Sequence, residues 1–213
     1  MYRTIVPEIL DSLDATDPEA VRSQRDLRRL DLLLGGSRWI VRKLGRRDVN
    51  PELRICELGA GEGRLCERLA RAFPRTRVTG LDLQPRPASL LESVAWVRGD
   101  FFEAPALREA DVVVGSLILH HFHEEDLRRL GAGFSRARTL VFSEPWRDQG
   151  VLSRAALALP FVGKVTKHDM PASIRAGFRP GEMAAALGLQ TSEWKIAESS
   201  HWQGVIRMIA YRR

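Results

Sequence analysis

The chain has 213 residues, 44% of them hydrophobic and 28% charged, which is the balance of a soluble globular protein with one domain-sized core. Two cysteines, Cys56 and Cys66, are too few for a disulfide framework, so we expect reduced thiols in a cytoplasmic protein. The first residues lack a basic stretch followed by an apolar one, and no window approaches the roughly 18 apolar residues of a membrane span. We therefore expect neither a signal peptide nor a membrane span.

The net charge of +6 and the pI of about 10.0 allow a nucleic-acid partner. Almost all of the positive charge is arginine, spread along the chain and often beside acids, as in EEDLRR at 124–129. Such spacing favours a solvated surface. We keep nucleic acid as the alternative partner.

Residues 1–50 are expected to be mostly helical. A first long helix should begin at a cap formed by Thr16 or Asp17 and end at Gly35–Gly36. Ser37 should then cap a second helix. We interpret residues 1–50 as a helical lid segment that precedes the main domain.

The main domain is expected over residues 51–213, where strands and helices alternate. Apolar runs predict five strands, at 52–58, 77–83, 94–100, 110–117 and 138–144. Helical spacing of apolar residues predicts connecting helices at 62–73, 87–93 and 124–134. Strands that alternate with helices pair in parallel through right-handed crossovers, so we expect an α/β fold.

A long connection, residues 145–180, follows the fifth strand. It contains a helical pattern at 151–161, and a connection of this length is often a functional lid, although a peripheral helix is the other interpretation. A helix at 181–189 then precedes two strands, at 190–198 and 204–212. These strands are too close in sequence for a crossover and should pair antiparallel.

The segment ICELGAGEGRL, at 55–65, places a glycine-rich turn between a strand and a helix. Such a turn can aim backbone N–H groups at a ligand, or it can be only a tight turn. It does not fit the dinucleotide fingerprint, because Arg64 stands where a small residue is needed, and no Gly-Lys-Ser/Thr follows as in a P-loop. Glu57, at the strand end, would repel a pyrophosphate and suit a cationic group.

Acidic residues end three consecutive predicted strands, at Glu57, Asp82 and Asp100. Ligands of open α/β sheets bind at the carboxyl ends of strands. Asp82 follows the glycines by about twenty residues, where an acidic side chain can bind two ribose hydroxyls. Asp100 can accept from an exocyclic amine, and Phe101 can cover a purine face. A cationic nucleoside is therefore the expected ligand.

These residues resemble the class I S-adenosylmethionine-dependent methyltransferases. The resemblance is carried by ICELGAGEGRL, VTGLDL, VRGDFFE and DVVVGSLILHHF. It covers about residues 50–145 by motif and 180–213 by the terminal hairpin. It implies a Rossmann-like three-layer sandwich whose seven-stranded, mostly parallel sheet has an antiparallel terminal strand. It also implies S-adenosyl-L-methionine as cofactor and S-adenosyl-L-homocysteine as product.

The resemblance also implies roles for individual residues. The glycine loop would run beside the methionine half of the cofactor, and Glu57 would help to hold its ammonium group. Asp82 would bind the ribose, Leu83 would pack on the adenine, and Asp100 would meet the adenine amine. The full set of expected cofactor-binding residues is Glu57, Gly59, Ala60, Gly61, Asp82, Leu83, Asp100, Phe101 and Ser116.

Histidines follow the fourth predicted strand at 120, 121 and 123, at the mouth of the expected site. One of them could act as a general base near neutral pH, or the rings could simply pack. We favour His121 slightly over His120, and Glu144 after the fifth strand is a further catalytic candidate. We expect no metal site, because no carboxylate stands at a clear spacing from these histidines.

The expected substrate-binding residues are Trp146, His168 and Arg175 in the long connection. His168 and Asp169 could form an orienting pair, and Arg175 could hold an acidic substrate or cap a helix.

The whole pattern looks most like small-molecule methyltransferases. We expect methyl transfer to a small organic acceptor, aromatic or polyketide-like, with O-methylation favoured over C-methylation. Residues 115–118, GSLI, lack the Asn/Asp-Pro-Pro-aromatic segment of nucleic-acid amine methyltransferases. An RNA methyltransferase and a non-catalytic S-adenosylmethionine-binding module are the alternatives. We expect a monomer or a homodimer.

Overall fold

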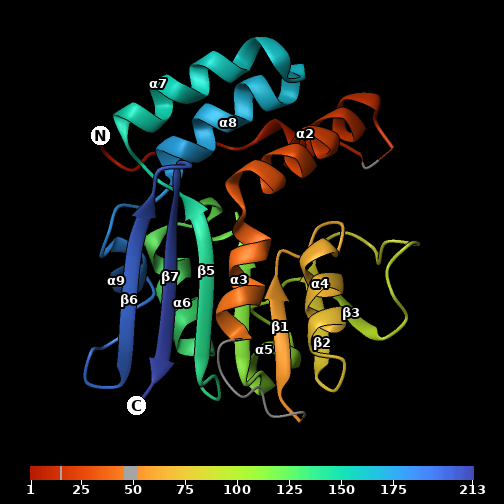
Figure 1. Ribbon diagram of the computed structural model, residues 1–213, viewed down its shortest axis with the longest axis vertical. Coiled ribbons are helices and arrows are strands. Elements are labelled where there is room, and N and C mark those ends of the chain that lie inside the picture. The colour runs from red at the N-terminus through yellow and green to blue at the C-terminus, as the bar shows by residue number, and fades with distance from the viewer. Residues whose placement is uncertain (15, 46–51) are drawn as a thin grey trace.

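The computed structural model describes residues 1–14, 16–45 and 52–213, and a single sheet forms its centre. Its seven strands are β1 (Arg54–Leu58), β2 (Arg77–Asp82), β3 (Val94–Arg98), β4 (Val112–Ser116), β5 (Thr139–Pro145), β6 (Trp194–His201) and β7 (Val205–Arg212). Their order across the sheet is β3-β2-β1-β4-β5-β7-β6 (Figure 1). The first five strands are parallel, and β7 lies antiparallel between β5 and β6. The predicted fold class is confirmed.

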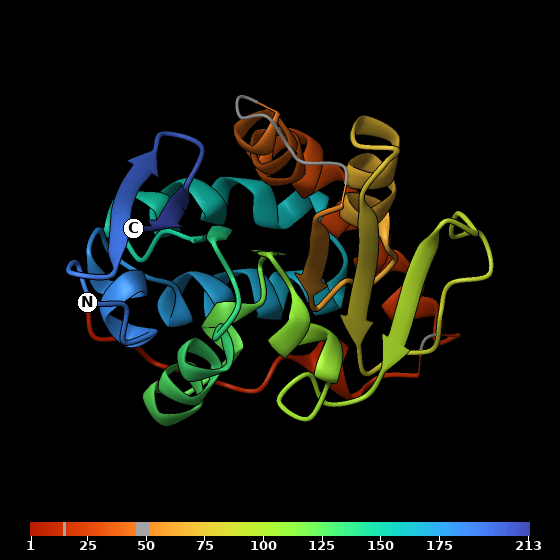
Figure 2. The same ribbon diagram turned by 90° about the horizontal axis from the view of Figure 1, so that it is seen from below.

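Helices cover both faces of the sheet (Figure 2). They are α3 (Gly36–Leu44) and α4 (Arg64–Ala72) on one face, and α5 (Pro105–Glu109), α6 (Glu124–Gly133) and α9 (Glu182–Ala186) on the other. Each face has its own buried cluster, in which Ile40 and Leu69 represent the first and Leu127 and Met183 the second. Burial on both faces explains why β4 reads as an unbroken apolar run, Val112 to Val114, rather than as an alternating pattern.

A third group of helices lies beyond the carboxyl ends of the parallel strands (Figure 1). It consists of α1 (Ile9–Ser12), α2 (Pro18–Leu34), α7 (Gln149–Ala158) and α8 (Lys164–Ala176), with short 3-10 turns η1 (Leu119–His121) and η2 (Leu159–Phe161). We call α1, α2, α7 and α8 the helical layer. None of the described helices is long and apolar enough to cross a bilayer.

Buried polar contacts join the two ends of the sequence within the helical layer. The carboxylate of Asp26 in α2 accepts from the backbone N–H of Gly163, 2.7 Å away, and so caps α8. In the other direction, the carboxylate of Asp169 in α8 accepts from the backbone N–H groups of Ile9 and Leu10 at the start of α1. The expected lid segment and the long connection therefore pack as one unit.

An elbow of two glycines joins the helical layer to the sheet. Gly35 ends α2 in the left-handed conformation, with φ of 66°. A Cβ on Gly36 would lie 2.9 Å from Ser116 Oγ and 3.2 Å from Ser143 Oγ, so only glycine permits this approach to the ends of β4 and β5.

Two local predictions are wrong. Gly35, rather than Ser37, occupies the N-cap of α3, and Ser37 instead donates from its backbone and hydroxyl to Asp31. Residues 87–93 form turns rather than a helix. Here the Arg86 guanidinium donates to the carbonyl groups of Leu90, Leu91 and Val94 and so holds the turns in place.

Close packing at one glycine of α6 gives a test of the fold. A Cβ on Gly131 would overlap the carbonyl group of Leu187 at the end of α9. We expect Gly131→Ala to destabilise the protein by about 1–3 kcal/mol, or roughly 2–4 °C in Tm for each kcal/mol. The matched control is Gly133→Ala in the same helix, where the new methyl group would meet only Leu107 at 3.8 Å. Equal thermal stability of the two variants would contradict this packing.

Candidate functional site

The glycine loop lies at the carboxyl ends of β1 and β2 and has an unusual backbone. Gly59, Gly61 and Gly63 all have positive φ, of 61°, 53° and 72°. A Cβ on Gly59 would meet Ile118 Cδ1 at 2.5 Å, whereas a Cβ on Gly61 would meet nothing within 4 Å. The loop is therefore packed against the segment after β4 on one side and open at Gly61.

Hydrogen bonds fix this loop to β2. Ala60 donates its backbone N–H to the Leu81 carbonyl at 3.1 Å, and Gly61 donates to Asp82 Oδ2 at 2.7 Å. The other oxygen of Asp82 accepts from the N–H of Gln84 at 2.8 Å. Each carboxylate oxygen keeps a further lone pair, so Asp82 can hold the loop and still accept from two hydroxyls.

Glu57 is the least satisfied polar group of the site. It is 4% exposed, and its Oε2 has no hydrogen-bond partner among the described residues. Burial raises the pKa of Glu57, hydrogen bonds from Cys66 lower it, and the nearby charges of Asp82 and Asp31 raise it, so that the pKa is about 8. Because an unpartnered buried carboxylate is costly, this position suits a cationic group that would complete its hydrogen bonds.

The remaining expected cofactor residues lie along the same edge of the sheet. Leu83 follows Asp82 and is 70% exposed, so its side chain is accessible to a ligand. Asp100 is exposed and accepts from the N–H of Phe102. Phe101 is only 8% exposed and packs against Phe102 and Phe122, with ring centroids 5.0 and 5.3 Å apart. The structure therefore places Phe101 in the core cluster, while Leu83 and Asp100 face outward.

Sequence reasoning missed two residues of α2 that reach this region. Arg28 forms an ion pair with Glu62 of the glycine loop, with Nε and Oε2 3.4 Å apart. Asp31 lies near enough to Glu57 for its charge to raise the pKa of that residue. No sequence signal marks them, because only the elbow at Gly35 brings α2 over the strand ends.

The expected catalytic residues do come together, at the ends of β4 and β5. Glu144 is fully buried and accepts from the backbone N–H groups of Ile118, Leu119 and His120, at 2.9, 3.0 and 3.3 Å. Its Oε2 also lies 2.8 Å from His120 Nδ1. Glu144 therefore holds the 3-10 turn η1 in place, and with it both histidines.

The two histidines of η1 differ in exposure. His120 is 2% exposed; burial lowers its pKa, but hydrogen bonds to Glu144 and Glu8 outweigh this and raise the pKa to about 9. The side chain of His121 is 24% exposed, and its Nδ1 lies 3.3 Å from Asp11 Oδ2. Of these two rings, His121 alone has appreciable accessible surface.

Glu8 was also missed by sequence reasoning. Its Oε1 lies 3.3 Å from His120 Nε2 and accepts from the Ser173 hydroxyl of α8. A contact between residues 112 positions apart leaves no local signal.

The expected substrate residues do not gather in one place. Trp146 is half-buried against the core and donates its N–H to Gly204. His168 is exposed on α8, with Nδ1 2.9 Å from Asp169 Oδ1, so the pairing considered from sequence does form. The side chain of Arg175 is exposed at the end of α8. No hydrogen bond or ion pair connects Trp146, His168 and Arg175 with one another among the described residues.

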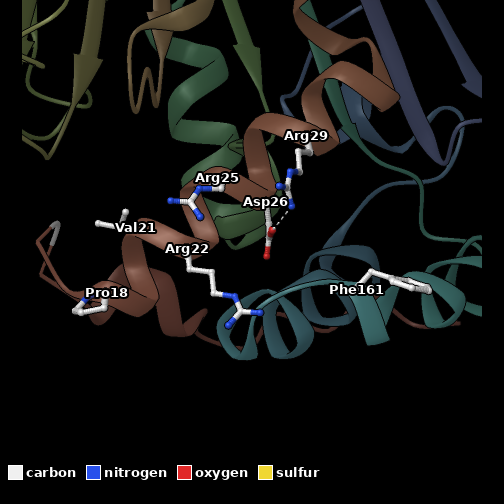
Figure 3. Close-up of a pocket in the computed structure, with 7 residues that line it drawn as sticks. All are labelled: Pro18, Val21, Arg22, Arg25, Asp26, Arg29 and Phe161. Atoms are coloured by element: carbon white, nitrogen blue, oxygen red, sulfur yellow. Dashed lines mark ion pairs between the residues drawn. The ribbon is translucent and has the colours of Figure 1, made fainter.

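A hollow of about 380 Å³ lies along α2, away from the strand ends (Figure 3). Its lining residues are Pro18, Val21, Arg22, Arg25, Asp26, Arg29 and Phe161. Asp26 is buried there and pairs with Arg29 at 3.7 Å while capping α8. None of the site residues expected from the sequence lines this hollow.

The raised pKa of Glu57 predicts a pH dependence of stability. Since its pKa in the fold, about 8, exceeds the usual 4.5, the fold favours the neutral form. The stability that this preference contributes is complete below the unfolded pKa and is lost as pH rises towards 8, at about 1.4 kcal/mol for each unit of pKa difference.

We therefore expect the free energy of unfolding of the wild type, relative to Glu57→Gln, to fall between pH 5 and pH 8. Urea unfolding of both proteins at several pH values measures this difference. Parallel pH profiles would show that Glu57 is not perturbed in this way.

The chain has relatives with known activities. Residues 55–138, from β1 to the residue before β5, match the methyltransferase domain family. The chain is 31% identical over 139 residues to acetylserotonin O-methyltransferase of Mus musculus molossinus, covering 55% of this chain and 36% of that protein. It is 25% identical over 112 residues to malonyl-[acyl-carrier protein] O-methyltransferase of Priestia megaterium, covering 49% and 41%. It thus spans less than half the length of these two relatives.

Solved structures show the same fold. The plantazolicin methyltransferase BpumL, in complex with a monoazolic desmethylPZN analog and S-adenosylhomocysteine, aligns with a TM-score of 0.70 and 13% identity, covering 93% of this chain and 91% of that one. Residues 55–138 thus match a methyltransferase domain, and the chain has the fold of a methyltransferase solved with S-adenosylhomocysteine.

Proposed function

We propose that this chain transfers a methyl group from S-adenosyl-L-methionine to a small organic acceptor, aromatic or polyketide-like, and that the methylated atom is oxygen. The observation that carries the proposal is the buried, unpartnered oxygen of Glu57 beside a glycine loop that is open at Gly61. A ligand with an ammonium group and a permanently cationic sulfur suits this carboxylate, whereas a phosphate would be repelled.

The residues at the strand ends fit the parts of such a cofactor. In this proposal Glu57 accepts from the ammonium group, and Asp82 accepts from the ribose hydroxyls. Leu83 offers exposed apolar surface to the adenine, and Asp100 offers a carboxylate to its amine. When bound, the cofactor supplies an electrophilic methyl group on sulfur. What remains for the protein is chiefly to position the acceptor in line with that group.

On the acceptor side, we propose that His121 accepts the proton of the acceptor hydroxyl. Its partly exposed ring supports this role, and Asp11 next to Nδ1 would orient the ring. Glu144 and His120 would position η1 from behind, since both are buried. The helical layer would exclude water. Trp146, His168 and Arg175 remain proposed acceptor contacts. The names of the two curated relatives, both O-methyltransferases, support oxygen as the methylated atom.

Asp82→Ala tests the cofactor site. We expect its Kd for S-adenosylmethionine to rise at least tenfold, because the variant loses both the hydroxyl acceptor and the contact that fixes Gly61. Isothermal titration calorimetry measures this. The matched control is Glu193→Ala, just before β6 at the opposite edge of the sheet, which should bind as the wild type does. An unchanged affinity in Asp82→Ala would remove the ribose assignment, and no cofactor binding by the wild type would refute the whole proposal.

His121→Ala tests the acceptor side. Loss of a general base commonly costs about 10²–10⁴-fold in rate, so we expect turnover to fall in this range while the Kd for S-adenosylmethionine stays within about twofold. The readout is S-adenosylhomocysteine formed with a panel of phenolic acceptors. The control is His123→Ala, an exposed histidine beyond η1. Retained turnover in His121→Ala would assign that ring to packing.

A further inference from the structure

Three side chains with metal-binding atoms meet where the N-terminal segment crosses η1. Glu8, His120 and His121 each offer one ligand atom, and these atoms lie within 4.8 Å of one another. Glu8 and His121 are partly buried and His120 is fully buried, so this is not a chance gathering of solvated surface groups. These three side chains can bind a cation, which methyl transfer does not require.

Glu144 determines which nitrogen of His120 carries a proton. The carboxylate already accepts from backbone N–H groups, so it is an acceptor towards Nδ1 as well, 2.8 Å away. Nδ1 must therefore carry the hydrogen. In the neutral ring, Nε2 then presents a lone pair, and 3.3 Å away it faces Glu8 Oε1, another acceptor. A proton or a metal ion between these two atoms satisfies both.

His121 repeats this arrangement. Its Nδ1 is the nitrogen that faces a carboxylate, that of Asp11, at 3.3 Å. A hydrogen on Nδ1 leaves Nε2 as the free donor atom of this ring too. Histidines that bind metals commonly donate their other N–H to a carboxylate, which fixes the tautomer and the ring orientation.

Charge favours a cation here. Glu8, Asp11 and Glu144 place three carboxylates around the two rings. The guanidinium of Arg3 lies close by, but it donates to backbone carbonyl groups, those of His120, Phe122 and Ala176. With neutral imidazoles, the carboxylates thus exceed the nearby positive charge.

We propose that Glu8 and the Nε2 atoms of His120 and His121 bind a divalent transition-metal ion of the Zn²⁺ type. Two imidazoles and a carboxylate form a donor set typical of such ions, and three protein ligands leave a position open. With bonds of about 2.0–2.1 Å in a tetrahedral site, neighbouring ligand atoms are about 3.4 Å apart. The separation of 3.3 Å between Glu8 Oε1 and His120 Nε2 already matches this, and the ligand atom of His121 lies within 4.8 Å of the other two.

This site could not be expected from the sequence, which placed no carboxylate near the histidines. The carboxylate comes from a segment 112 residues earlier in the chain. An ion on His121 Nε2 would occupy the lone pair that the proposed general base uses, so the two roles exclude each other in one molecule. Metal binding is therefore measured on the protein alone, without cofactor or acceptor.

The experiment titrates the metal-free protein with Zn²⁺ against a chromophoric chelator at pH 7.5, and with Co²⁺ by visible absorption. We expect one equivalent of Zn²⁺ to bind and Co²⁺ to give the d–d bands of a low-coordinate nitrogen and oxygen site. Glu8→Gln and His121→Ala should each weaken Zn²⁺ binding at least tenfold, in line with the loss of a ligand. Glu8→Gln keeps the side-chain shape and an oxygen that can accept from Ser173.

The matched control is His123→Ala, which removes an exposed histidine outside the cluster and should bind Zn²⁺ like the wild type. Circular dichroism of each variant checks that it is folded. The proposal is overturned if the wild type binds neither ion with a Kd below about 100 μM, or if Glu8→Gln and His121→Ala bind Zn²⁺ as the wild type does. The second result would assign the ion to surface histidines.

Discussion

The arrangement of the site depends on one buried carboxylate. Glu144 stands at the end of β5 with no exposed surface and accepts from three consecutive backbone N–H groups and from the ring of His120. Contacts then run outward from His120 to Glu8 and from Glu8 to Ser173 in α8. The rigid sheet and the helical layer are thus joined by a short chain of polar groups. Because Glu144 and His120 are buried, loss of either would leave the other without its partner, at a cost of about 1–3 kcal/mol or more.

A second constraint acts at the elbow between α2 and α3. Because Gly36 has no side chain, the backbone approaches the hydroxyl groups of Ser116 and Ser143, and α2 is carried across the strand ends. That position brings Asp31 and Arg28 towards the glycine loop. The elbow places α2, and Glu144 holds η1. Together they determine which helices surround the expected ligand.

Much of this architecture could be predicted from local pattern. The five parallel strands, the terminal hairpin and the glycine loop were predicted because each depends on residues close together in sequence. Helix α2 was predicted with a cap at Thr16 or Asp17, and the structure has Asp17 in that position. Helix α8 was not, because Pro171 in its middle reads as a break although the tertiary contacts of α8 keep it helical. At 87–93 a weak helical pattern gave a wrong prediction, because Arg86 donates to the carbonyl groups of Leu90 and Val94, four and eight residues further on, and stabilises turns instead.

Some residues of the candidate site could likewise be predicted from local pattern, and others could not. Glu57, Asp82 and Asp100 could be found because parallel strands bring their carboxyl ends to one edge of the sheet. Glu8 and Asp31 could not, because each meets its partner only through the path of the N-terminal helices. Phe101 illustrates a third case: its position at the strand end was right, but the periodicity of a loop could not reveal that its ring packs with Phe122.

The N-terminal segment has a consequence of its own. Its described residues before α2 include one helix of four residues. Arg3 nevertheless donates to three carbonyl groups, and Glu8 contacts His120. Its place is therefore set by what its side chains bind rather than by its own secondary structure. A change that displaces η1 or α8 would therefore displace this segment as well.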